Sequence, residues 1–306
     1  MPDPNFTHTI TANPEIPESF QLAKITGSRE NCDIIVMNDP DADRMGVAIW
    51  NKKEYVILNG NQVASLMVYY KLQQLKKRDE LPSKLALYTT FVSGELPSLI
   101  GKKFDVKTFL TPTGFKWMAN EIEQNKKTYN FFFSFEQAIG YLLSDFVHDK
   151  DGLQAATFFV DLANYYKVVE NKTPLDVLEE IYQEYGYYHE EDISFTLDNP
   201  RSGEVFEKVM EIFTQRRINT IAEYLVLSKQ DFSVNYPKPE YKCNLVKIKF
   251  EFGWIAIRAS GTEPKIKVYF SIHSPTKTQT QIIFQKLKNA LSTIVSTQML
   301  EVLGKQ

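Results

Sequence analysis

The run I-I-V-M-N-D-P-D-A-D-R, Ile34–Arg44, joins a short apolar segment to a polar loop with three carboxylates. The apolar residues predict a buried strand, Cys32–Met37, and residues 39–44, which we call the aspartate loop, follow it. The carboxylates stand at i, i+2 and i+4 and can converge on one point (Asp39, Asp41 and Asp43). Unpaired carboxylates about 4 Å apart repel each other by about 1 kcal/mol even in water. A hard divalent cation with oxygen ligands removes that repulsion, so the run predicts a loop that binds Mg²⁺ or Ca²⁺.

The aspartate loop has other interpretations. An EF-hand is excluded, because Arg44 stands where that motif needs glycine and Trp50 where it needs glutamate. A phosphatase of the haloacid-dehalogenase type, with D-x-D after a strand, would use Asp39 as its nucleophile but would leave Asp43 and Arg44 without a role. An ordinary acidic turn is the third interpretation, although Pro40 within a triple-aspartate loop is not typical turn chemistry.

The segment around this loop, residues 1–52, contains few predicted helices and strands. We expect a helix from Glu15 to Thr26 that ends at Gly27, then the strand before the aspartate loop and a second strand, Gly46–Trp50. One helix and two strands cannot bury a doubly covered core by themselves. We therefore expect residues 1–52 to be the C-terminal remnant of a larger domain that carries the metal loop.

The remaining residues divide into two domains of different pattern. Residues 53–186 alternate apolar strands with helices, which predicts an α/β domain with a parallel sheet and right-handed crossovers. Asn59 and Asn61 offer N-caps for the helix Gln62–Leu75. Residues 187–306 group a helix, three strands and a long final helix, Thr278–Leu300, which predicts a separate α+β domain with an antiparallel sheet.

Composition excludes several classes of function. Hydrophobic residues make up 43%, charged residues 24%, and the net charge is −3, which is typical of a globular protein. Without a long basic run, nucleic acid is not an expected partner. No apolar stretch approaches the ~18 residues of a membrane span, and the first residues do not form a signal peptide. Two distant cysteines predict reduced thiols in the cytoplasm rather than a zinc site.

Two segments of the middle domain follow strands and carry polar groups. In T-P-T-G-F-K-W, Thr111–Trp117, Gly114 permits close approach to a ligand, the next helix begins with free N–H groups that favour an anion, and Lys116 adds positive charge. A lysine on a solvated helix face is the alternative for Lys116. The second segment, S-F-E-Q-A-I-G-Y, Ser134–Tyr141, carries Glu136 directly after a strand.

The last domain contains R-A-S-G-T-E-P-K-I-K, Arg258–Lys267, between two predicted strands. Small residues with two hydroxyls and consecutive N–H groups form an anion nest (Ser260, Gly261 and Thr262). The Arg258 guanidinium matches phosphate oxygens, whereas Lys267 faces the same ligand or the solvent. A plain hairpin loop is the alternative.

Taken together, these motifs resemble the α-D-phosphohexomutases, especially the branch similar to phosphoglucomutase 2, which includes phosphopentomutases. D-P-D-A-D-R resembles the metal loop of that family, and N-P-E at Asn13–Glu15 and L-N-G-N-Q at Leu58–Gln62 agree with it. T-G-F-K, F-E-x-x-G-Y, D-K-D-G at Asp149–Gly152 and R-A-S-G-T-E-P follow in the family's order. Gln137 and Ala138 depart from the usual F-E-E-S-x-G-Y, and this difference bears on which sugar is preferred.

The resemblance implies roles for these residues. Mg²⁺ would be held beside a phosphoserine by Asp39, Asp41 and Asp43. The candidate catalytic residues are Arg44 and Lys116, the latter at the transferring phosphate. Substrate would be bound by Thr113, Gly114, Glu136, Lys150, Arg258, Ser260, Gly261, Thr262 and Lys267. For Lys150, the start of the next helix is an equal alternative. The last loop would grip the phosphate that is not transferred.

The implied reaction interconverts a hexose 1-phosphate and 6-phosphate through a sugar bisphosphate, which makes the family isomerases of carbohydrate metabolism. The family's nucleophilic serine stands in an S-H-N-P-like segment, and these 306 residues contain none. Before Asp39 the serines are Ser19 and Ser28, neither beside a histidine. We therefore expect this chain alone to be inactive, with the N-terminal domains as a possible separate partner chain. The alternatives are a non-catalytic sugar-phosphate-binding protein, a phosphopentomutase and the phosphatase that uses Asp39.

Overall fold

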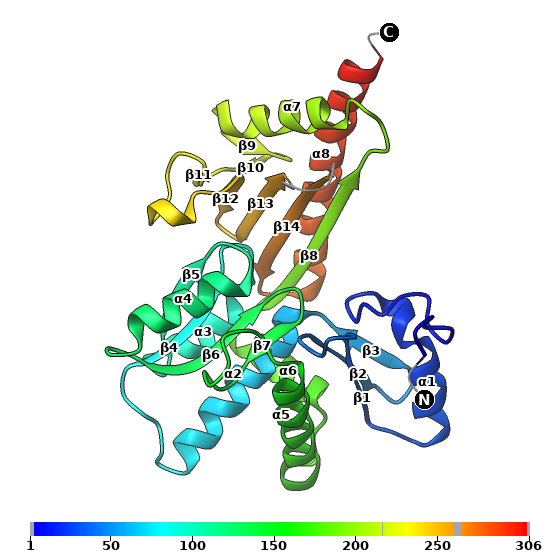
Figure 1. The fold of residues 1–306 in the computed structure, drawn as a ribbon, viewed down its shortest axis with the longest axis vertical. Coiled ribbons are helices and arrows are strands. Elements are labelled where there is room, and N and C mark those ends of the chain that lie inside the picture. Colours follow the sequence, from blue (N-terminus) through cyan, green and yellow to red (C-terminus); the bar gives the residue numbers. More distant parts are fainter. Residues whose placement is uncertain (1–2, 216, 260–264, 305–306) are drawn as a thin grey trace. The chain divides into compact units, whose positions relative to one another are not determined.

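The computed structural model describes residues 3–215, 217–259 and 265–304, and every structural statement below concerns these residues. The chain forms two compact units, Met1–Ile181 and Tyr182–Gln306, which are described separately (Figure 1). The first unit contains residues 1–52 together with most of the predicted middle domain. The division at residue 52 therefore stays a prediction.

A small antiparallel sheet lies near the start of the first unit. After a 3₁₀ turn, Pro17–Phe20, and helix α1, Gln21–Arg29, strands β1, Ile34–Asn38, β2, Met45–Trp50, and β3, Tyr55–Leu58, pair in that order. The helix covers one face of this sheet, where Phe20, Ile35, Ala48 and Tyr55 form a buried cluster. The strand Tyr55–Leu58 was not predicted.

The predicted end of the first helix at Gly27 is wrong, because α1 continues to Arg29. A Cβ atom at Gly27 would lie 2.6 Å from the Tyr55 hydroxyl oxygen. Glycine is therefore present here for close packing against the sheet rather than as a helix stop.

The second sheet of this unit has the order β5-β4-β6-β7. Its strands are β4, Leu85–Thr90, β5, Lys107–Thr111, β6, Asn130–Glu136, and β7, Gly140–Leu142. The first three strands run parallel, which confirms the predicted α/β class, and β7 adds an unpredicted antiparallel edge.

Helices α3, Leu96–Lys102, and α4, Phe115–Asn125, connect the parallel strands. Helix α2, Gly60–Lys77, precedes β4, and α5, Gly152–Tyr165, follows β7. A π-helical turn, Tyr166–Glu170, and α6, Pro174–Tyr185, follow. Asn59 caps α2 in a capping box with Gln62, which confirms one of the two predicted caps.

The second unit is an antiparallel sheet of order β11-β12-β13-β14-β8, as predicted for an α+β domain. Its strands are β8, Tyr187–Thr196, β11, Ser228–Asp231, β12, Leu245–Phe250, β13, Gly253–Ala259, and β14, Lys265–Ser274. A hairpin of two short strands, β9, Thr220–Ile221, and β10, Tyr224–Leu225, and a 3₁₀ turn, Pro239–Tyr241, complete the connections.

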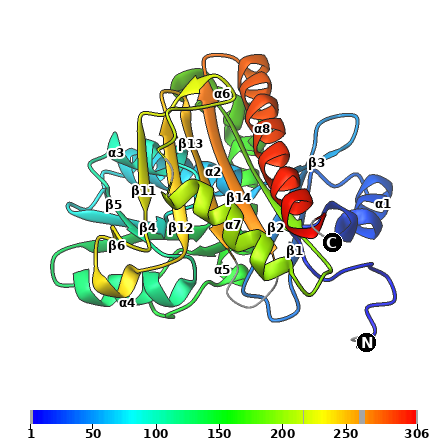
Figure 2. The ribbon, with the colours of Figure 1, turned by 90° about the horizontal axis from the view of Figure 1, so that it is seen from above.

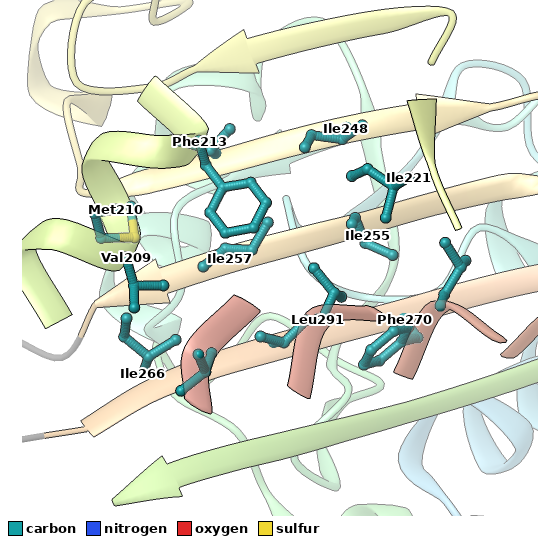
Figure 3. Packing of buried hydrophobic residues seen from close by; sticks show 14 of the residues in the cluster. Val209, Met210, Phe213, Ile221, Ile248, Ile255, Ile257, Ile266, Phe270 and Leu291 are labelled. Carbon is teal, nitrogen blue, oxygen red and sulfur yellow. The ribbon is translucent and has the colours of Figure 1, made fainter. Parts of the chain in front are cut away.

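Helices α7, Ser202–Gln215, and α8, Lys277–Leu303, cover one face of this sheet (Figure 2). Their apolar residues interleave with alternate residues of three strands, as Val209 and Phe213 do with Ile257 and Ile266 (Figure 3). A period-two pattern identified β14 in the sequence, and runs of β-type residues identified β12 and β13. Across the described residues, no helix is long and apolar enough to span a membrane.

Candidate functional site

The aspartate loop connects β1 to β2, and its own side chains fix its shape. The Asn38 side-chain amide donates to the Arg44 carbonyl oxygen at 2.8 Å, across the base of the loop. The Arg44 backbone N–H donates to Asp39 Oδ1 at 3.0 Å. Ala42 has a φ of +56°, and its N–H donates to the Asp39 carbonyl oxygen at 3.0 Å. The loop is therefore a tight, internally hydrogen-bonded turn.

The three aspartates lie together as predicted. One carboxylate oxygen from each lies within 4.8 Å of the others, with Asp39 buried, Asp41 exposed and Asp43 between them in exposure. Asp43 Oδ1 is buried and has no hydrogen-bond partner in the described structure. A buried oxygen that lacks a donor, beside two more carboxylates, fits a hard divalent cation such as Mg²⁺.

Arg44 is held against Asp39. Its Nε lies 2.6 Å from Asp39 Oδ2, and Nη1 lies 3.4 Å from Asn13 Oδ1 and from Glu15 Oε2. Burial acts to raise the pKa of Asp39, but the hydrogen bonds from Arg44 outweigh it and hold that pKa below its usual value. The N-P-E segment thus contacts the aspartate loop through Arg44.

Lys150 is paired with Asp43. The Lys150 Nζ lies 2.5 Å from Asp43 Oδ2 and 3.2 Å from Asp149 Oδ1. Burial raises the pKa of Asp43, and the nearby Asp39 adds to the rise against the opposing effect of Lys150. Lys150 thus contacts the aspartate loop, which neither interpretation of this lysine included, and it lies two residues before the start of α5.

Two glycines bring the aspartate loop and the D-K-D-G segment together. The Gly152 N–H donates to the Ala42 carbonyl oxygen at 3.0 Å, and a Cβ atom at Gly152 would lie 2.6 Å from the Arg44 carbonyl oxygen. Gly140 forms an isolated β-bridge with Arg44, and a Cβ there would lie 2.7 Å from Lys150 Cδ. The loop packs against main chain at both positions, so neither tolerates a side chain without movement.

Glu136 and Gly114 also meet, at the edge of the sheet where β5 and β6 end. Gly114 has a φ of +110°, and its N–H donates to Glu136 Oε1 at 2.7 Å. Thr113 lies beside it and is partly exposed. Lys116 is exposed, with its Nζ 5.1 Å from the centre of the Trp117 ring. Phe115 follows Gly114 in this segment, and the Lys150 Nζ lies 6.0 Å from the centre of the Phe115 ring.

Gln137, which departs from the family pattern, takes part in a buried polar network. Its Oε1 accepts from Ser93 Oγ at 3.1 Å and lies 3.3 Å from Thr90 Oγ1. Thr90 ends β4 and Ser93 follows it. Three neighbouring parallel strands thus end in polar residues at one edge of the sheet (Thr90, Thr111 and Glu136). Sequence reasoning missed Ser93, although its position after an apolar strand was a usable signal.

In the second unit, Arg258 and Lys267 lie directly opposite each other on β13 and β14. Two like charges at such a cross-strand position are destabilising unless an anion or an acid compensates. Asp192 on β8 partly does so, because its Oδ2 lies 3.0 Å from Lys267 Nζ. The predicted phosphate loop, Ser260, Gly261 and Thr262, lies outside the described residues.

Comparisons with known proteins identify the family of this chain. Models of the phosphoglucomutase/phosphomannomutase family match three parts of the chain in order: α/β/α domain II at residues 1–52, α/β/α domain III at residues 59–185 and the C-terminal domain at residues 197–282. A phosphoglucomutase of Staphylococcus aureus strain MSSA476 is 34% identical over 286 residues, which cover 89% of this chain and 50% of that protein. The enzyme of strain N315 is 33% identical over 285 residues.

Solved structures show the same fold. A phosphoglucomutase/phosphomannomutase family protein of Burkholderia thailandensis superposes with a TM-score of 0.62 at 14% identity, covering 92% of this chain and 51% of that one. The open form of the Paramecium phosphoglucomutase parafusin gives 0.57 at 18% identity, covering 88% and 45%. The chain thus spans about half the length of the relatives it matches.

Proposed function

Because the chain belongs to the phosphoglucomutase/phosphomannomutase family, we propose that it supplies the metal-binding, sugar-binding and phosphate-binding parts of a Mg²⁺-dependent phosphohexomutase. The reaction proposed is the interconversion of a hexose 1-phosphate and 6-phosphate through a sugar bisphosphate. The observation that carries the proposal is the meeting of Asp39, Asp41 and Asp43 with the D-K-D-G segment in one unit.

The proposed metal ligands are the three aspartates. A bound Mg²⁺ would neutralise charge on a phosphoryl group, which is the main requirement of phosphoryl transfer. Arg44 keeps Asp39 ionised and correctly placed, and Asp43 Oδ1 offers an oxygen without a donor. In this proposal Lys116 acts at the transferring phosphate, and Arg44 acts by holding the shape of the loop.

The proposed sugar subsite lies where Glu136 meets the T-G-F-K segment. In the present structure Glu136 Oε1 accepts a hydrogen bond from the Gly114 N–H, so binding of sugar hydroxyls by that oxygen would compete with this bond. Thr113 and Lys150 complete the proposed lining. Gln137 is already engaged with Ser93, which supports a structural role for this departure from the family pattern.

The proposed site for the second phosphate is the end of the hairpin between β13 and β14. The like-charged pair of Arg258 and Lys267 supports it, because an anion between them would relieve their repulsion. Ser260, Gly261 and Thr262 would add backbone N–H groups.

The phosphatase alternative is weakened by the family models that match the chain, since all three describe phosphoglucomutase/phosphomannomutase domains. Both carboxylate oxygens of Asp39 accept hydrogen bonds from Arg44, one from the backbone N–H and one from Nε, which supports a role for this pair in shaping the loop. We propose a cytoplasmic protein, for which the free Cys32 and Cys243 are support, and a sugar phosphate as its partner. A separate chain that carries the N-terminal domains is the further partner proposed.

The metal site is tested by calorimetry of Mg²⁺ on the chain and on Asp41→Asn. We expect weak binding, because no phosphoserine oxygen completes the ligand set, and a further loss in Asp41→Asn. Lys126→Met, which removes a surface lysine paired with Glu123, serves as the control. Tight binding that Asp41→Asn leaves unchanged would place the ligands elsewhere.

A further inference from the structure

The Lys150 amine lies between two carboxylates of different character. Asp43 belongs to the aspartate loop and its side chain is 26% exposed, whereas Asp149 precedes Lys150 in the chain and is 66% exposed. We propose that Lys150 is the resident counter-ion of the aspartate loop, and that an entering divalent cation displaces its amine from Asp43 towards Asp149. This inference rests on the metal site of the proposed function.

The stem of Lys150 is guided to the loop by its surroundings. A Cβ atom at Gly140 would lie 2.7 Å from Lys150 Cδ, so the methylene chain runs directly over this glycine. The amine also faces the Phe115 ring, with Nζ 6.0 Å from the ring centre. The Lys150 side chain is only 18% exposed. The amine is therefore held at Asp43 by packing as well as by charge.

The positions of the charges explain why the lysine should leave. The cluster holds five carboxylates and two cations, because Glu15 contacts Arg44 and Asp149 contacts Lys150 in addition to the three loop aspartates. A divalent cation bound by the loop aspartates would lie next to the amine on Asp43, and two cations so close repel each other. Departure of Lys150 towards Asp149 relieves that repulsion and frees Asp43 Oδ2, which the lysine otherwise covers, while Oδ1 has no hydrogen bond to give up.

Of the two cations, Lys150 is the one that can move. Arg44 is bound through its backbone and guanidinium to Asp39 and also reaches Asn13 and Glu15. Lys150 is a flexible point charge with a second acceptor, Asp149 Oδ1, already at 3.2 Å. Its shift needs rotation of one side chain, whereas removal of Arg44 would dismantle the loop.

A consequence is that metal entry and phosphate binding are coupled. An amine that has left Asp43 is available to an anion next to the metal, so a ligand phosphate would meet Lys150 only after the cation is in place. The coupling is one between two binding events and is therefore reciprocal.

The inference is tested by titrating Mn²⁺ and Mg²⁺ calorimetrically into the 306-residue chain, Lys150→Met, Lys126→Met and Asp41→Asn. Loss of a competing, partly buried cation should tighten metal binding in Lys150→Met between about threefold and tenfold. Lys126→Met should match the unmodified chain. A lysine with only a structural role would give the opposite sign, because its loss would loosen the loop and weaken the metal.

A second measurement uses the unmodified chain and needs no variant to fold. Acetylation of amines by a water-soluble active ester, followed by mass spectrometry, should show Lys150 reacting severalfold faster with Mg²⁺ than without it, and Lys126 unchanged. If Asp41→Asn weakens the metal but Lys150→Met does not tighten it, or if Lys150 reacts equally with and without Mg²⁺, the displacement is refuted while the metal site stands. If Asp41→Asn has no effect on metal binding, both fail.

Discussion

Replacement of Gly152 by alanine should detach the aspartate loop from α5. The added methyl would meet two backbone oxygens, 2.6 Å from that of Arg44 and 2.8 Å from that of Ala42, as well as the Asn38 side-chain amide. Backbone oxygens cannot turn aside as a flexible side chain would. Gly152 lies at the first position of α5 with no positive φ, so the effect is one of contact and not of backbone strain.

The magnitude follows from two contributions. Overpacking of a filled site usually destabilises by about 1–3 kcal/mol, and loss of the Asn38–Arg44 bond adds about 1 kcal/mol. The better helix propensity of alanine returns at most about 1 kcal/mol. We expect Gly152→Ala to lower the free energy of unfolding by about 2 kcal/mol, which is roughly 4–8 °C in Tm for a unit of this size.

Gly203→Ala is the matched control. Gly203 lies in the first turn of α7, and no atom lies within 4 Å of a Cβ added there. This variant should be neutral or more stable by up to about 1 kcal/mol. Urea denaturation followed by circular dichroism gives the stability, and hydrogen exchange of peptides covering residues 34–50 should locate the change at the aspartate loop.

The refuting result is clear. If Gly152→Ala is as stable as Gly203→Ala and residues 34–50 exchange as before, the close contact between the loop and α5 is not present in solution. A loss of stability without faster hydrogen exchange in residues 34–50 would mean that a shift in another part of the unit relieves the steric clash of the added methyl.

Three further predictions concern turnover, anion binding and pH. With Mg²⁺ and glucose 1,6-bisphosphate, the 306 residues alone should not interconvert glucose 1-phosphate and glucose 6-phosphate in a coupled assay, because no S-H-N-P segment is among them; turnover abolished by Asp39→Asn would contradict this. Glucose 6-phosphate should shift the amide resonances between Arg258 and Lys267, and Arg258→Gln should weaken that binding about tenfold, as expected for loss of one charged fork; shifts confined to other segments would remove this site. Burial lowers the pKa of His189 below 6.5, so the unfolded chain takes up the proton first and the free energy of unfolding should fall as the pH falls below about 6.5. Chemical denaturation at pH 7.5 and 5.5 measures this, and His189→Gln should reduce the difference; an unchanged difference would assign the pH dependence to other groups.

The strands that could be predicted from the sequence are those with a clear pattern of apolar residues. Strand β14 alternates apolar and polar residues, and strands β4, β6 and β13 each contain a run of apolar residues, so each was identifiable. The edge strand β8, Y-Y-H-E-E-D-I-S-F-T, was missed because only one side of an edge is paired and its residues are largely polar. The end of the first helix was wrongly placed at Gly27, because the sequence does not distinguish a glycine needed for close packing from one that ends a helix.

In the candidate site, too, local features could be predicted and long-range contacts could not. The aspartates were predictable because three carboxylates in one short loop need a common partner. The pairing of Lys150 with Asp43 was not, because it joins residues more than a hundred positions apart, and nothing local records such a contact. Likewise, Asn38 is an ordinary polar residue until its amide is seen to close the loop.

The contact between Gly152 and the aspartate loop has a consequence for how these sequences can diverge. Residues 1–52 and 59–185 match separate domain models, yet the main chain of one is hydrogen-bonded to the main chain of the other through Ala42 and Gly152. The two segments are therefore not interchangeable parts. Among relatives, substitutions around Ala42 and Arg44 should co-vary with those at Gly140 and Gly152, and a chimaera that takes its loop from one relative and its α5 from another should inherit a misfitted metal site.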